Sequence, residues 1–127
     1  MLFIDSSYLI ALLIDNDKNN SRASVLANKI SEKKLINNTV LSETLNSYIN
    51  SGGKLTKELF SMINETYDIH YLSEKEYEKT IDTYLNYDSA INYNDCTILQ
   101  SMKKFDINRI VSFDSNFDKI EWIKRIY

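Results

Sequence analysis

The chain has 127 residues, of which 43% are hydrophobic and 26% charged, a length that suits one domain whose buried core needs neither disulfides nor a structural metal. One cysteine and one histidine exclude an internal disulfide, a zinc site built from cysteines, and chemistry that needs two imidazoles. Fifteen Lys and Arg against eighteen Asp and Glu give a net charge of −3, which argues against a polybasic nucleic-acid binder.

Short apolar runs alternate with amphipathic stretches along the whole chain. The expected elements are, in chain order, a strand at Leu2–Ile4, a helix at Tyr8–Ile14, a helix at Ser21–Lys33, a strand at Leu35–Ile36, a helix that begins at Thr39 or Ser42 and ends at Gly52–Gly53, a helix at Leu55–Tyr67, a strand at Ile69–Leu72, a helix from Ser73 through Tyr84, a helix at Asn94–Phe105, a strand at Arg109–Ser112 and an edge strand at Trp122–Ile126. This alternation predicts an α/β domain over residues 1–127, with a central, mainly parallel sheet of four to five strands and helices on both faces.

Polar residues and glycines mark the expected helix ends. Ser6 or Ser7 can cap the first helix, and Ser73 forms a capping box with Glu76. Gly52–Gly53 is expected to stop the third helix, as glycine does at helix ends. The second helix is expected to bury an apolar stripe made of Ala23, Val25, Leu26 and Ile30.

Five acidic residues fall just beyond predicted strands or near the starts of predicted helices. They are Asp5 directly after the first strand, Glu43 in the first turns of the helix after the second strand, Asp95 at the start of its helix, Asp114 two residues after the fourth strand, and Asp118 one turn further. Ligands in open α/β sheets bind beyond the carboxyl ends of the strands, so we expect these acids on one rim. Helix N-termini beneath Glu43 and Asp95 would stabilise negative charge there, including a substrate phosphate.

Such a rim favours a divalent cation. Two carboxylates about 4 Å apart repel each other by roughly 4 kcal/mol at an effective dielectric near 20, so a cluster of acids persists by binding cations, by raised pKa values or by spreading apart. Oxygen ligands without His or Cys select Mg²⁺ or Mn²⁺ over zinc, and Mg²⁺ in such a site suits phosphoryl chemistry.

Each acid also has a purely structural interpretation. Glu43 and Asp95 could complement a helix dipole, and Asp5 could cap the helix that follows it. Asp114 could belong to a turn or an N-cap, and Asp118 could be a solvated turn residue. Their convergence on one predicted rim is what favours a site. Two other residues with reactive side chains, Cys96 and His70, are interpreted as structural.

In four segments the chain resembles the PIN-domain ribonucleases, specifically the small VapC-type toxins of toxin–antitoxin modules. The segments are Phe3–Leu12, a strand that ends in Asp followed by Ser; Ser42–Leu45; Ile91–Cys96; and Val111–Asp118, with Ser112, any residue, Asp114. The four segments are spread along the sequence, so the resemblance covers essentially the whole chain. The chain departs from the family at Trp122, where many relatives have glycine.

The resemblance implies a divalent-metal-dependent endoribonuclease that hydrolyses RNA with one or two Mg²⁺ or Mn²⁺ ions. Asp5 and Asp95 would be the principal metal ligands, and Glu43 and Asp114 would complete the site directly or through water. The resemblance further implies an outer-ligand or water-orienting role for Asp118, and an orienting role as hydrogen-bond donors to the acids for Ser6 and Ser112. It also implies a homodimer and a small antitoxin protein whose tail enters the acidic groove.

Other interpretations can be compared with the sequence. A haloacid-dehalogenase phosphatase needs a second aspartate where Ser7 stands, and a phosphoreceiver needs an acidic pair after the first strand and a lysine at the end of a late strand. Two alternatives stay open: a catalytically silent PIN module that binds protein or RNA, and a stand-alone RNA-processing PIN nuclease. The chain lacks both a run of about 18 apolar residues and a signal-like start, so we expect a cytoplasmic protein without membrane contact.

Overall fold

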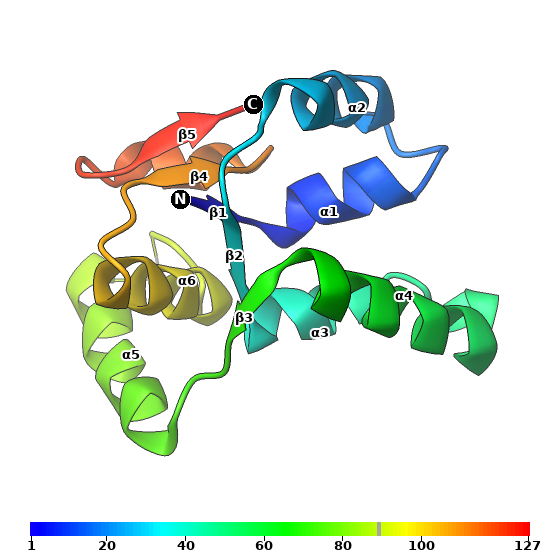
Figure 1. Ribbon diagram of the computed structural model, residues 1–127. Helices are drawn as coiled ribbons and strands as arrows, with labels where there is room; N and C mark the ends of the chain where they lie inside the picture. The colour runs from blue at the N-terminus through cyan, green and yellow to red at the C-terminus, as the bar shows by residue number, and fades with distance from the viewer. Residues whose placement is uncertain (89) are drawn as a thin grey trace.

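Five short parallel strands form one sheet, in the order β3-β2-β1-β4-β5, in the computed structural model (Figure 1). The structure describes residues 1–88 and 90–127. The strands are β1 (Leu2–Ile4), β2 (Lys34–Asn37), β3 (Asp68–His70), β4 (Arg109–Val111) and β5 (Lys124–Ile126). Every pairing between neighbours is parallel, which confirms the predicted α/β class and its mainly parallel sheet.

The first strand of the chain, β1, lies at the centre of the sheet. All three residues of β1 are buried, as expected for a parallel strand covered on both faces. Phe3 lies opposite Leu35 of β2 on one side, and Ile4 lies opposite Val111 of β4 on the other. Because β4 pairs directly with β1, segments more than a hundred residues apart in the sequence lie side by side.

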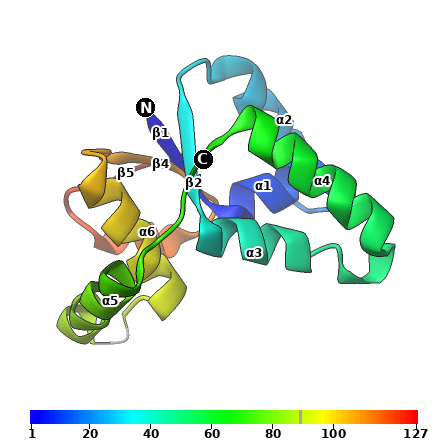
Figure 2. The ribbon, with the colours of Figure 1, turned by 60° about the horizontal axis from the view of Figure 1, so that its bottom comes forward.

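Within the described residues, six α-helices and two short 3₁₀ helices connect the strands. They are α1 (Ser6–Leu13), α2 (Asn20–Lys29), α3 (Asn38–Asn46), η1 (Ile49–Ser51), α4 (Gly53–Thr66), α5 (Glu74–Tyr87), α6 (Tyr93–Lys104) and η2 (Ser115–Lys119). The chain steps outward from β1 to β3 and then returns to β4, so right-handed crossovers place α1 to α4 on one face and α5 with α6 on the other. Figures 1 and 2 show these two groups on opposite sides of the sheet.

Some predicted helix ends were wrong. Asn37, the last residue of β2, caps α3 by accepting a hydrogen bond from the backbone of Val40, so neither Thr39 nor Ser42 is the cap. Nor does the glycine pair end α3, because the helix stops at Asn46. Gly52 instead stands at the N-cap of α4 with a φ of +87°, a conformation open to glycine.

The start of α1 and the buried stripe of α2 also differ from expectation. Ser6 and Ser7 lie inside α1 rather than capping it. Ala23 and Leu26 of α2 are buried, but Val25 is 44% exposed, because a residue two positions from a buried one faces the other side of a helix. The Ser73–Glu76 capping box of α5 is confirmed.

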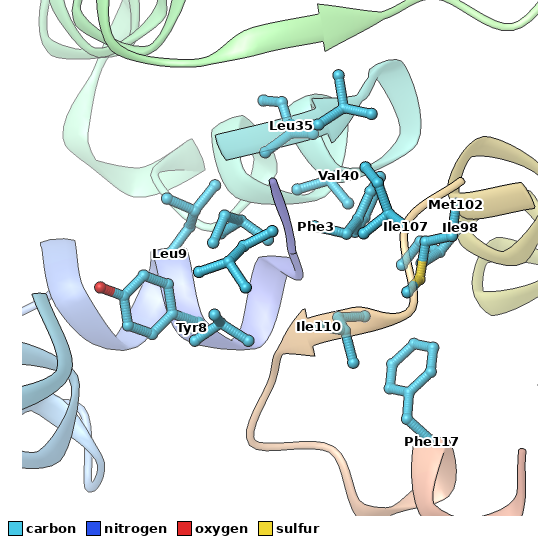
Figure 3. Close-up of a cluster of buried hydrophobic side chains, with 14 of the residues drawn as sticks. Phe3, Tyr8, Leu9, Leu35, Val40, Ile98, Met102, Ile107, Ile110 and Phe117 are labelled. Carbon is cyan, nitrogen blue, oxygen red and sulfur yellow. The ribbon is translucent and has the colours of Figure 1, made fainter. Parts of the chain in front are cut away.

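The core fills both faces of the sheet. Figure 3 shows side chains of β1, β2, α1 and α3 meeting those of β4 and α6, with Phe117 of η2 at one edge. Each fully buried apolar side chain of this kind contributes about 1.5 to 3 kcal/mol relative to its exposed state. Phe3, Ile110 and Phe117 are completely buried, and together they attach β1, β4 and η2 to one core. Over residues 1–88 and 90–127, no helix is long and apolar enough to cross a membrane.

Candidate active site

The strand order reverses between β1 and β4. The chain runs from β1 in one direction to β2 and β3, and then continues on the other side of β1 with β4, which makes this the point where the strand order reverses. In open α/β sheets, ligands bind outside the carboxyl ends of the strands at such a point. Asp5 directly follows β1, and Ser112 and Asp114 follow β4.

Asp5 is a buried carboxylate, 5% exposed, held by two serines. The hydroxyls of Ser7 and Ser112 both donate to Oδ2, at 2.6 and 2.7 Å. Burial raises the pKa of Asp5, the two hydrogen bonds lower it, and the nearby charge of Glu43 raises it again. Although Asp5 stands at the N-cap position of α1, its side chain accepts no capping hydrogen bond. Its alternative interpretation as a helix cap was therefore wrong.

The two serines also join Asp5 to the segment after β4. The backbone N–H of Phe113 donates to Ser7 Oγ at 3.0 Å, and that of Asp114 donates to Ser112 Oγ at the same distance. The contact of Ser112 with Asp5 is of the kind expected of an orienting residue. Sequence reasoning considered Ser7 only as a cap, since nothing in its spacing shows that it lies opposite residue 113.

Glu43 is half-buried on α3, and both of its oxygens are engaged. Ser6 Oγ donates to Oε2 and Asn94 Nδ2 donates to Oε1, each at 2.6 Å. Ser6 and Ser7 thus hold two different acids from successive positions of α1. Glu43 lies beyond the first turn of α3, which argues against its interpretation as a dipole partner of that helix. Asn94 was not predicted, because a single asparagine in an asparagine-rich chain carries little signal.

Asp95 is the acid whose pKa is raised by the charges of the other three. It is 6% exposed and lies in the first turn of α6, where it forms a capping box with Asn92. Burial, followed by the charges of Asp5 and Asp114 and, more weakly, of Glu43, raises the pKa of Asp95 to about 7. The structure therefore brings these four predicted acids within electrostatic reach of one another. The interpretation of Asp95 as an acid at the start of a helix is also confirmed, since it lies in the first turn of α6.

Asp114 and Asp118 have different surroundings. Asp114 caps η2 by accepting a hydrogen bond from the backbone of Asn116 at 2.9 Å, so its N-cap interpretation is confirmed while it still contributes charge to the rim. Asp118 is paired with Arg125: Nε donates to Oδ1 and Nη2 to Oδ2, both at 2.8 Å. This pair lowers the pKa of Asp118 and occupies both oxygens that the predicted outer-ligand role would use.

The donor chemistry of the rim suits a hard cation. In the part of the chain that the structure describes, none of Asp5, Glu43, Asp95 and Asp114 forms an ion pair with a basic side chain. Carboxylate and hydroxyl oxygens without nitrogen or sulfur favour Mg²⁺ or Mn²⁺. No three His, Cys, Asp or Glu side chains of residues 1–88 and 90–127 stand close enough together to hold an ion between them. Mg²⁺ in proteins commonly binds through only one or two carboxylates and keeps several waters, so the donor set fits it.

Cys96 and His70 have structural surroundings, as predicted. Cys96 is completely buried in the core beside Asp95, and burial raises the pKa of its thiol to about 11. His70 lies between Ser101, 2.9 Å from Nδ1, and Glu76, 3.0 Å from Nε2. Neither side chain joins the acids of the rim.

Comparison with known proteins gives a consistent picture. The family model of the PIN domain matches residues 2–123. The fold is similar to Mycobacterium tuberculosis VapC20, a toxin that cleaves the sarcin–ricin loop, with a TM-score of 0.84, 19% sequence identity and 97% of each chain covered. It is also similar to a toxin–antitoxin complex from Klebsiella pneumoniae, with a TM-score of 0.76, 14% sequence identity, and 98% of this chain and 96% of that chain covered. A third similar structure is VapBC2 of Rickettsia felis bound to a promoter DNA fragment, with a TM-score of 0.69, 14% sequence identity, and 99% of this chain and 98% of that chain covered. No protein of curated function matches the chain in sequence.

Proposed function

The chain belongs to the PIN domain family, and from this we propose that it is a divalent-metal-dependent endoribonuclease, the toxin of a toxin–antitoxin module. One observation carries the proposal. Asp5, Glu43, Asp95 and Asp114 come from four separate segments, and the charges of the other three help to raise the pKa of Asp95, while among the described residues none of the four forms an ion pair with a basic side chain. A structural role alone does not require this concentration of uncompensated charge.

Asp5 and Asp95 are the proposed principal ligands of one or two Mg²⁺ or Mn²⁺ ions, and Glu43 and Asp114 complete the site directly or through water. When bound, such ions activate a water molecule for attack on phosphorus and stabilise the charge of the leaving oxygen. Asp118 is left outside this set, because both of its oxygens already accept hydrogen bonds from Arg125.

The polar side chains around the acids fix their orientation. Ser7 and Ser112 hold Asp5, and Ser6 and Asn94 hold Glu43, so that each carboxylate keeps one geometry before a ligand arrives. Partners of this kind orient ligands and tune their affinity for a metal. Asp95 lies at the N-terminal end of α6, and a helix N-terminus favours an anionic group such as a phosphodiester.

The same rim is the proposed docking point of an antitoxin. Four acids that form no ion pair with a basic side chain among the described residues are complementary to a Lys or Arg side chain of a partner, which would neutralise their charge and exclude metal and RNA together. The similarity to a toxin–antitoxin complex and to VapBC2 supports this partner. We also propose a homodimer located in the cytoplasm, as the resemblance to VapC-type toxins implies.

The test is RNA cleavage with Mg²⁺ or Mn²⁺ by the wild type and by the Asp5→Asn and Asp95→Asn variants. We expect cleavage that EDTA abolishes and that each variant loses, because each substitution removes a principal ligand. Asp82→Asn, an exposed acid of α5, is the matched control and should cleave like the wild type. Cleavage that persists in EDTA or in both folded variants would contradict the mechanism. A folded wild type that is inert on diverse RNAs would favour a silent PIN module instead.

A further inference from the structure

All three nitrogens of the Arg125 guanidinium, on β5, donate hydrogen bonds. Its side chain is 8% exposed and makes the two-pronged pair with Asp118 described above. Its Nη1 donates to the backbone carbonyl of Ser112 at 3.2 Å, and its guanidinium carbon lies 3.7 Å from the centre of the Tyr127 ring. The planar fork of arginine is suited to such simultaneous contacts, which the single ammonium of lysine cannot reproduce.

These contacts grip both ends of one short segment, residues 112–118. At its start, Ser112 donates to Asp5 and accepts from the backbone of Asp114. At its end, Asp118 lies in η2, the helix that Asp114 caps. Between them Phe117 is completely buried in the core. Arg125 therefore contacts the segment on either side of Asp114 without touching that carboxylate itself.

We propose that Arg125, held by Asp118, is a positioning residue for the metal-binding carboxylates. By fixing residues 112–118 it keeps Ser112 on Asp5 and keeps Asp114 beside Asp95. Asp118 then acts through Arg125 and is not an outer metal ligand. This inference rests on the proposed function, since it assigns a role at the same site.

The charge and the positioning role of Arg125 have opposite effects on cation binding. A positive charge near the rim repels a divalent cation, so if charge were all that mattered, replacing Arg125 with a neutral residue would strengthen Mn²⁺ binding. Loss of positioning weakens Mn²⁺ binding, because Asp5 and Asp114 no longer hold one geometry. The sign of the change therefore separates the two effects. Arg125→Lys separates them again, since it keeps the charge and loses the fork.

The experiment is a titration of the metal-free protein with Mn²⁺, followed by electron paramagnetic resonance, on the wild type, Arg125→Met and Arg125→Lys. We expect both variants to bind Mn²⁺ about 10- to 100-fold more weakly, the usual effect of removing a residue that orients a ligand. The matched control is Arg109→Met, which removes the ion pair of Arg109 with Glu32 at the opposite end of β4 and should leave Mn²⁺ affinity unchanged.

A double-mutant cycle tests the role of Asp118. Asp118→Asn should weaken Mn²⁺ binding in the wild type and have no further effect in Arg125→Lys, because both substitutions break the same unit. A further loss of affinity in the Arg125→Lys background would show that Asp118 binds the metal directly, which would overturn the inference. Arg125→Lys keeps the aliphatic stem and the charge, so it provides the test even if Arg125→Met does not fold.

Other outcomes separate this inference from the proposed function. If the wild type binds Mn²⁺ and cleaves RNA while folded Arg125→Lys and Arg125→Met do the same, only the positioning role fails. Tighter Mn²⁺ binding by Arg125→Met would likewise overturn it in favour of a simple charge effect. A wild type that neither binds Mn²⁺ nor cleaves RNA would contradict the proposed function itself.

Discussion

Replacing Asp95 with asparagine should stabilise the metal-free protein at pH 8 and leave its stability unchanged at pH 4. In the folded chain, burial and the neighbouring acids raise the pKa of Asp95 from 3.8 to about 7. A carboxyl group whose pKa is raised by folding favours the folded state fully below the unfolded pKa, near 4. That contribution is lost as the pH rises through 7. Asparagine has nearly the same shape and carries no charge, so it escapes this loss.

The magnitude follows from the shift in pKa. About three pH units at 1.36 kcal/mol each correspond to roughly 4 kcal/mol, and screening at a rim that faces water reduces this to about 2 kcal/mol. Bound Mn²⁺ should narrow or cancel this difference in stability. At a concentration of 100 times its Kd, an ion that binds only the folded wild type adds about 2.7 kcal/mol, which the variant gains only in part.

The assay is urea unfolding at pH 4 and pH 8, followed by the fluorescence of Trp122, the single tryptophan. EDTA removes metal in one series, and Mn²⁺ is added in the other. Asp82→Asn is the control, and its unfolding free energy should stay within about 0.5 kcal/mol of the wild type. If Asp95→Asn destabilises the metal-free protein at pH 8, or if its effect is the same at both pH values, the electrostatic reasoning is refuted.

Three further substitutions test other parts of the structure. Asn37→Ala removes the cap of α3 and a buried hydrogen bond to Ser101, and should lower the free energy of urea unfolding by about 2 to 3 kcal/mol; a loss below 0.5 kcal/mol would contradict this. Gly52→Ala forces a side chain into the positive-φ region and should cost roughly 1 kcal/mol by the same assay, with RNA cleavage unchanged. Ser6→Ala frees Glu43 on one side and should reduce kcat for RNA about 10-fold while the protein stays folded; an unchanged kcat would show that this hydrogen bond does not orient Glu43.

The strands were predictable because a parallel strand buried on both faces must be an apolar run, and β1 and β4 are short, clear examples. The ends of the helices were less predictable than the strands, because a single residue can belong to one element and cap the next. Asn37 both ends β2 and caps α3, so the cap lies before the residues that spacing suggested. The role of Gly52 depends on where the preceding helix has already stopped, and that end is set by tertiary packing.

The positions of Asp5, Asp95 and Asp114 were predictable because each follows a strand or opens a helix, and parallel strands bring such positions to one rim. Their partners were not. Ser7 meets Phe113 across 106 positions, and Asn94 meets Glu43 across 51, so nothing local in the sequence marks either contact. The contact of Arg125 with Asp118 was also not predictable, although the two residues are only seven positions apart. Nothing in that spacing indicates a contact until β5 is known to pair with β4.

The pairing of β1 with β4 bears on when the proposed nuclease can act. Ser112, which orients Asp5, is made 107 residues after it, and Arg125 is made later still. A growing chain that lacks β4 has no partner for one side of its central strand and no rim for the acids to share. A nascent chain of the proposed nuclease should therefore be inert toward RNA until β4 has been made and has paired with β1.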